Sequence, residues 1–371
     1  DLENQYAELA FRLLLVEDAE NLSELLVFGV IKWDVLLNLA RENRIVIRLY
    51  ERLLQLGVKP GEAYEDYVTE ERQRIGHTLD LMERIDQMCE DVGLVSVFMK
   101  NHQHYPDMGD DIDLLVIDRN HVVDSIVAHR LDARPFKLSL LNQFGGKTQY
   151  YFENSPTYLE IHHGRVGRMG EHLIFPRFLV GNRRRVCLVG KYVYVPSSED
   201  QIILQVLQRT YGRFNIRLSE LVYLVSAIRE DQLDWEYIAD TTRKIGIFEG
   251  LRYYLSCVNA IHKRALGDVL PLDRPELLNL SVATKVSFKS PYYRLPWLTV
   301  GSHLYLWKLL ADVEVSNWDG VVRLSLAPVF AVLVGGEVLL KRVGLKSRGK
   351  PSISWRLNTE RELALSKEGE K

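Results

Sequence analysis

Hydrophobic and polar positions divide the chain into a helical first part, a strand-rich middle part and a helical last part. In residues 33–57, apolar side chains recur at spacings of three and four, which predicts one helix or a pair of helices. After the break at Pro60-Gly61, the same spacing predicts a second long helix over residues 62–91.

The hydrophobic period changes after Gly93. LVSVFMK (94–100) and DIDLLVID (111–118) are short, apolar and rich in β-branched residues, which is typical of buried strands. The extended runs FKLSLLNQF (136–144) and KTQYYFEN (147–154) flank two glycines and are expected to form a hairpin. TYLEIHHG (157–164) alternates apolar and polar residues and predicts one more strand.

Helical periodicity returns near Ser198, dominates to about His262 and persists through the last hundred residues, with breaks near Pro271, Pro291 and Pro296. This order of elements predicts an α+β fold in which a small mixed β-sheet lies between two helical regions. The expected divisions are an N-terminal helical region over 1–92, an α/β core over 93–196 and a C-terminal helical region over 197–371.

Composition sets limits on these interpretations. Of the 371 residues, 47% are hydrophobic and 26% charged, and the formal net charge is -3, as in ordinary globular proteins. This charge argues against a protein that coats nucleic acid non-specifically, although it leaves room for a local basic groove. Three widely spaced cysteines without a CxxC pair are typical of a reducing compartment rather than a disulfide framework or a zinc ribbon.

The expected location is cytoplasmic. No signal or transit peptide is visible at the start of the sequence. The longest apolar stretch, 324–340, is interrupted by Pro328, Gly335, Gly336 and Glu337. It is therefore expected to be a buried helix and not a membrane span.

Two carboxylates in the segment GDDIDLLV carry the main chemical signal. Alternate side chains of a strand share a face, so Asp111 and Asp113 are expected to point the same way. Neighbouring carboxylates on an apolar strand raise each other's pKa, and a divalent cation relieves that conflict. Glu160 lies on another predicted strand, and if the two strands are neighbours, three carboxylates converge in the arrangement that two-metal nucleotidyl transfer needs.

Several segments resemble a family of uncharacterised nucleotidyltransferases within the DNA polymerase β-like nucleotidyltransferase superfamily. WDVLLNLARENRIVIRLYERLLQLG (33–57) is similar to the helical lead-in of that family. FMKNHQHYPDMGDDIDLLV (98–116) resembles its core motif, and LEIHHG (159–164) its acid-x-His motif, with Glu160 and His162 in the two places. VPSSEDQIILQVLQ and LSELVYLV are similar to its C-terminal helical segment.

The resemblance implies an enzyme that binds Mg²⁺ or Mn²⁺ and moves a nucleoside monophosphate from an NTP, with ATP the first candidate, to a hydroxyl acceptor. Asp111, Asp113 and Glu160 would be the catalytic and metal-binding residues, with Glu160 also a candidate base. Lys100, Asn101, Gly109 and Arg165 are the expected phosphate-binding residues. The acceptor is open among a small molecule, a protein side chain and an RNA such as tRNA.

Two rival interpretations remain. The family usually has Lys-Gly where this chain has Lys100-Asn101, which fits a catalytically impaired relative that acts as a binding or scaffold module. Four histidines, His102, His104, His162 and His163, are close in sequence to the predicted site residues. His102, His104 and His162 fit a histidine-bound transition metal in a hydrolase, or the histidines are polar residues that support the carboxylates.

Overall fold

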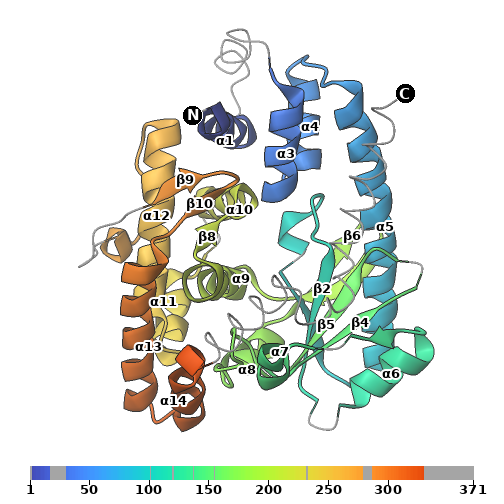
Figure 1. Cartoon of the computed structure of the whole chain (residues 1–371), viewed down its shortest axis with the longest axis vertical. Helices are drawn as coiled ribbons and strands as arrows, with labels where there is room; N and C mark the ends of the chain where they lie inside the picture. Colours follow the sequence, from blue (N-terminus) through green and yellow to red (C-terminus); the bar gives the residue numbers. More distant parts are fainter. Residues whose placement is uncertain are drawn as a thin grey trace, which may run out of the picture.

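A computed structural model of the chain describes residues 2–16, 31–100, 102–118, 121–136, 138–153, 155–230, 233–278 and 286–329. It has an α+β fold in which helices predominate and the largest sheet lies in the middle of the sequence, as expected (Figure 1). None of the helices within these ranges is long and apolar enough to cross a membrane. Most of the apolar stretch 324–340 lies outside the described residues.

The N-terminal part is helical. Its helices are α1 (Leu2–Leu15), α3 (Trp33–Asn43), α4 (Val46–Gln55) and α5 (Glu62–Asp91). The predicted helix or helix pair in 33–57 is a pair, because Arg44 adopts a left-handed conformation with φ 55° and ends α3. The long helix α5 runs down one side of the molecule (Figure 1) and packs against β1 (Ser96–Met99), β7 (Lys191–Val195) and α6 (Val122–Arg130).

The central sheet has five strands in the order β1-β2-β5-β4-β3. They are β1, β2 (Asp111–Val116), β3 (Arg134–Pro135), β4 (Lys147–Tyr151) and β5 (Tyr158–His163). Only the pairing of β2 with β5 is parallel within this sheet, and it sets Asp113 beside Glu160. Ile112, Leu114, Leu159 and Ile161 alternate with the acids and are buried in the hydrophobic core.

The hairpin predicted around Gly145-Gly146 is wrong. Residues Leu140–Phe144 form the short helix α7, because the Ser139 side chain accepts a hydrogen bond from the amide of Asn142 and caps the helix. β4 begins after the two glycines as expected, but it pairs with β5 and β3. A separate two-stranded sheet, β6 (Arg184–Leu188) with β7, was not predicted at all.

The C-terminal part is again mostly helical. After α8 (Phe175–Gly181) and the β6–β7 hairpin come α9 (Ser198–Val206), the π-helical segment η2 (Leu207–Arg213), α10 (Leu218–Arg229), α11 (Trp235–Lys244), α12 (Phe248–Leu266), the 3₁₀ turn η3 (Pro275–Leu278), η4 (Trp297–Gly301), α13 (Ser302–Glu314) and α14 (Trp318–Ser325). β8 (Asn215–Ile216), β9 (Ser287–Lys289) and β10 (Tyr292–Arg294) form a third small sheet. The division into 1–92, 93–196 and 197–371 stays a prediction.

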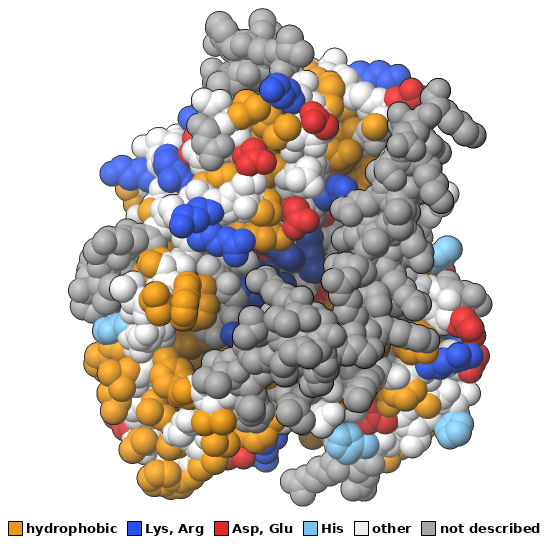
Figure 2. All heavy atoms as spheres, viewed as in Figure 1, with side chains coloured by type: hydrophobic (Ala, Val, Ile, Leu, Met, Phe, Trp, Pro, Cys, Tyr) orange, Lys and Arg blue, Asp and Glu red, His pale blue; other side chains and the backbone are white. Residues whose placement is uncertain are grey.

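Side chains of one kind gather in two places on the face in Figure 2. Hydrophobic side chains lie at the lower left, over α13 and α14, where Trp307, Leu310, Trp318 and Val322 are exposed. Basic side chains lie around the middle of the same face.

Candidate active site

The candidate site lies on one face of the central sheet, where β2 and β5 run side by side. In the parallel register, Asp111 lies opposite Tyr158 and Asp113 opposite Glu160. Alternation along the strands then places all four side chains on the same face. The parallel pairing therefore brings the predicted carboxylates together, and their catalytic role stays a prediction.

Asp113, Glu160 and His162 form the centre of this face. The Nε2 atom of His162 lies 3.1 Å from Asp113 Oδ1 and 3.0 Å from Glu160 Oε1. One ligand atom from each of the three residues falls within 4.8 Å of the others, close enough to share a metal ion. Because His162 is buried between the two carboxylates, it fixes their orientation.

Two lysines from the flanking strands balance the negative charge. Lys100 follows β1 in a left-handed conformation with φ 73°, and its Nζ lies 2.8 Å from Asp113 Oδ1. Lys147, at the start of β4, places its Nζ 2.7 Å from Glu160 Oε1. Gln149, two residues further along β4, donates a hydrogen bond to the second oxygen of Glu160.

These contacts keep the carboxylates ionised. Burial alone would raise the pKa of Asp113, but the charge of Lys100 and the hydrogen bond from His162 bring it below its ordinary range. Burial is outweighed in the same way at Glu160, whose pKa is lowered by His162, Lys147 and Lys100. The pKa of Lys100 is raised above its usual value, because the charges of Asp113 and Glu160 outweigh its burial. The site thus holds charged acids beside charged amines.

Asp111 lies at the rim of the site, next to an arginine. The guanidinium of Arg44, at the end of α3, lies 3.4 Å from Asp111 Oδ1. Gly109 makes room for this guanidinium, since a Cβ at that position would lie 2.5 Å from its atoms. The loop that carries Gly109 is held by Arg74 of α5, which donates hydrogen bonds to the carbonyl oxygens of Met108 and Gly109.

More arginines lie behind Arg44. Burial and the positive charges of Arg44 and Arg209 lower the pKa of Arg217 to about 10. The Nε of Arg217 is buried and has no hydrogen-bond partner among the described residues. Arg48 is paired with Asp107, and Arg209 with Glu220. Arg44 beside Asp111 and Arg217 close to Arg44 therefore concentrate positive charge, which is electrostatically suited to an anion.

The other predicted phosphate-binding residues lie in different surroundings. Asn101 falls outside the described residues. Arg165 is paired with Asp319 of α14, with Nη1 at 2.6 Å from Oδ2, and also donates to the Gly170 carbonyl. Its role in phosphate binding stays a prediction, as does that of Gly109.

His102 and His104 lie in the 3₁₀ turn η1 (His102–His104) and are buried. Burial and the charge of Arg184 lower the pKa of His102 to about 3. The pKa of His104 is lowered by burial and by the arginines around it, Arg44 foremost. Neither histidine belongs to either group of described residues that is arranged to share a metal ion, so the proposed set His102, His104 and His162 is not assembled.

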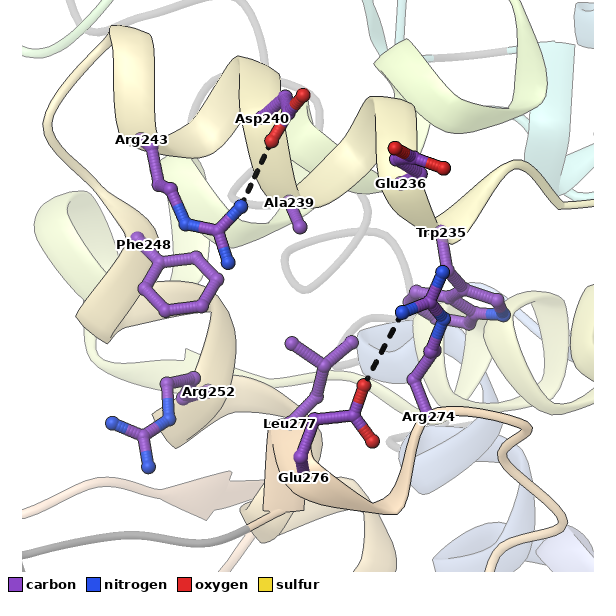
Figure 3. Close-up of a pocket in the computed structure, with 10 residues that line it drawn as sticks. All are labelled: Trp235, Glu236, Ala239, Asp240, Arg243, Phe248, Arg252, Arg274, Glu276 and Leu277. Atoms are coloured by element: carbon purple, nitrogen blue, oxygen red, sulfur yellow. Dashed lines mark hydrogen bonds and ion pairs between the residues drawn. The ribbon is translucent and has the colours of Figure 1, made fainter.

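A surface pocket of about 320 Å³ lies elsewhere, between α11, α12 and η3 (Figure 3). Its arginines are already matched by acids, since Arg243 pairs with Asp240 and Arg274 with Glu276. The Arg243 guanidinium also lies 4.3 Å from the centre of the Phe248 ring. None of the predicted site residues lines this pocket.

The α+β fold and the acids on adjacent strands of a mixed sheet agree with the nucleotidyltransferase class that the sequence predicts. The model of a family described as uncharacterised nucleotidyltransferase matches residues 30–262, and the chain belongs to this family. No curated protein and no solved structure matches the chain. The match covers α3 to α11 and most of α12, including all three carboxylates, and supports nucleotidyl transfer as the general class of activity.

Proposed function

We propose that the chain is a divalent-metal-dependent enzyme that transfers a nucleoside monophosphate from an NTP, with ATP the first candidate, to a hydroxyl group. The observation that carries the proposal is the pairing of Asp113 with Glu160 across neighbouring strands, with Asp111 two residues before Asp113 on the same face. Three acids in this arrangement match the needs of metal-assisted phosphoryl chemistry.

The donor set fits Mg²⁺ or Mn²⁺. Asp113 and Glu160 offer ionised carboxylate oxygens, which these cations prefer, and Asp111 offers a further carboxylate at the rim. When bound, the ion neutralises charge on the triphosphate and lowers the pKa of the attacking hydroxyl. Lys100 and Lys147 now stand within hydrogen-bond distance of the acids and would be free to turn to phosphate oxygens.

The residues of the site have different roles in the proposed reaction, namely metal binding, orientation of the acids and attraction of the triphosphate. Because its pKa is lowered, Glu160 is a weak base, and we assign it to metal binding in preference to proton abstraction. His162 orients both Asp113 and Glu160 through one nitrogen. Arg44 and Arg217 would attract the triphosphate through their positive charge. The buried Nε of Arg217 has no hydrogen-bond partner among the described residues.

Asp113→Asn tests the proposal directly. The change removes a charge at the centre of the site, so we expect Mg²⁺-dependent ATP binding, measured by calorimetry, to weaken at least about tenfold. Transfer of label from α-labelled ATP to RNA or protein acceptors should fall by about 100-fold or more. Asp110→Asn is the matched control, since Asp110 is exposed, and should change both by less than about twofold. Undiminished transfer by Asp113→Asn contradicts the assignment.

A second function has one observation in its favour. Lys100 and Lys147 already neutralise Asp113 and Glu160, as they would in a relative that has lost its metal and binds nucleotide without catalysis. This binding module should be stabilised by ATP equally with and without Mg²⁺ and should transfer no label. The enzyme should show a thermal shift that requires both.

A further inference from the structure

A second cluster of potential metal ligands lies on the other side of β5. His162 and His163 are adjacent on this strand, so their side chains point to opposite faces of the sheet. His163 meets Asp124 of α6 and His121, the residue that precedes this helix. This cluster is separate from Asp113, Glu160 and His162, and the proposed transfer reaction makes no use of it.

The three ligand atoms converge on one point. His121 Nδ1 lies 2.8 Å from Asp124 Oδ2, and His163 Nε2 lies 3.2 Å from the same oxygen. Ligand atoms at the corners of a tetrahedral zinc site stand roughly 3.3 Å apart, given metal–ligand bonds of about 2.0 Å. The described side chains therefore need only small adjustments to enclose an ion.

The second oxygen of Asp124 is anchored by two hydroxyl groups. Thr148 donates to Asp124 Oδ1 at 2.6 Å and Tyr150 at 2.8 Å, both from β4. These bonds fix the carboxylate so that Oδ2 faces the two imidazoles. Hydrogen bonds of this kind to the free atom of a ligand are a regular feature of metal sites in proteins.

The two imidazole rings lie close together, one buried and one exposed. The side chain of His163 is buried against α6. His121 has φ 54°, an uncommon conformation for a non-glycine residue, and this brings its ring centre to 4.0 Å from that of His163. The side chain of His121 is 56% exposed, which leaves a side open for water or a further ligand.

We propose that His121, Asp124 and His163 bind a zinc ion that fastens the start of α6 to β4 and β5. Two imidazoles and one carboxylate favour zinc over magnesium, which prefers an all-oxygen shell. Three protein ligands leave the fourth position for water. Without metal, the same residues form a hydrogen-bonded group in which Thr148 Oγ1 also lies 2.9 Å from His163 Nε2.

The test is calorimetric titration of the untagged, metal-stripped chain with Zn²⁺ alone, with metal content counted after gel filtration. His121→Asn removes one imidazole at an exposed position and keeps a residue that tolerates positive φ. We expect it to weaken zinc binding at least tenfold. His129→Asn, an exposed position on the same helix, should bind zinc as the native chain does. Co²⁺ in place of Zn²⁺ should give the intense visible absorption of a tetrahedral site in the native chain and not in His121→Asn.

Asp113→Asn separates this site from the candidate active site. Zinc binding that persists in Asp113→Asn and is lost in His121→Asn supports the proposal. Loss in Asp113→Asn with retention in His121→Asn would assign the ion to Asp113, Glu160 and His162, and so overturn it. The proposal also fails if the native chain binds no zinc at micromolar concentrations, because the cluster is then a hydrogen-bonded group only.

Discussion

His102 is buried in η1, and neither of its ring nitrogens has a hydrogen-bond partner among the described residues. Its pKa is lowered to about 3 by burial, with a contribution from Arg184, whereas an unfolded histidine titrates near 6.5. The folded chain therefore holds a neutral imidazole where the unfolded chain holds a charged one at mildly acidic pH. Protonation of His102 therefore stabilises the unfolded state relative to the folded state.

This imidazole predicts acid sensitivity of the fold. The contribution of His102 to the free energy of unfolding is fully present above pH 6.5. It is lost as the pH falls from 6.5 towards 3, at up to about 1.4 kcal/mol per pH unit. His102→Leu should show a smaller drop in the free energy of unfolding between pH 7 and 5, measured by urea titration at each pH. His129→Leu, at an exposed position, should follow the native curve. Parallel curves for His102→Leu and the native chain would remove His102 as the cause.

At the scale of single residues, the sequence predicted the positions of the acids at the candidate site better than those of the basic side chains. The motifs that contain Asp111, Asp113 and Glu160 can be recognised in the sequence. The alternation of side chains along the strands predicts which face of the sheet these acids occupy. Arg44 and Lys147 carry no motif, and they reach the site only through the end of α3 and the register of β4. Their contacts depend on tertiary packing, which hydrophobic periodicity does not encode.

Between elements, a buried ion pair joins the π-helical segment η2 to α10. Arg209 and Glu220 are both buried, with Arg209 Nε 2.7 Å from Glu220 Oε1. Arg209 also donates to Asn215 Oδ1 at 2.8 Å. Glu220 completes the start of α10 by accepting a hydrogen bond from the Arg217 amide. The pair therefore links a buried charge to a helix cap.

Removing one member of this pair should be costly. Arg209→Met leaves the Glu220 carboxylate buried without its partner, so we expect a loss of about 3–5 kcal/mol in the free energy of unfolding. The double variant Arg209→Met with Glu220→Gln should recover part of that loss, because no unpaired charge remains. Chemical denaturation of both variants measures the difference. A double variant less stable than the single one would show that charge burial is not the cause.

The helices and strands were predicted correctly where a single hydrophobic period continued along the segment without interruption. The helix predicted over 62–91 coincides with α5, and the strands predicted in 94–100, 111–118 and 157–164 contain β1, β2 and β5. The β6–β7 hairpin was missed because Arg184 and Arg185 make its first strand look like a charged surface run. Its signal was the Val189-Gly190 turn, where both residues have positive φ, between two alternating segments.

Across the whole molecule, α14 is tied to the region of the central sheet. Asp319 pairs with Arg165, which follows β5, and with Arg323 on its own helix. Arg323 also donates to the carbonyl oxygens of Phe144 and Met169. Residues more than 150 positions apart in sequence thus fasten the C-terminal helices beside the strands.

Asp319→Ala should loosen this attachment without unfolding the chain. The pair is partly exposed, so the expected loss of global stability is about 1 kcal/mol or less. Hydrogen exchange of the backbone amides in 318–325 should become faster, while exchange in α5 stays unchanged. Asp240→Ala, which removes an exposed pair with Arg243, serves as control and should alter neither. Equal protection of 318–325 in all three proteins would contradict this view.

The position of β5 has a consequence for the order of folding. β5 follows β2 and β4 in sequence, yet it lies between them and completes the sheet. Closing the long chain segment between β2 and β5 costs entropy before any contact repays it, so this pairing should form late. A nascent chain that ends before β5 holds Asp111 and Asp113 but no Glu160. Under the proposed function, nucleotidyl transfer would begin only in molecules in which β5 has joined the sheet, so activity would report that the sheet has finished folding.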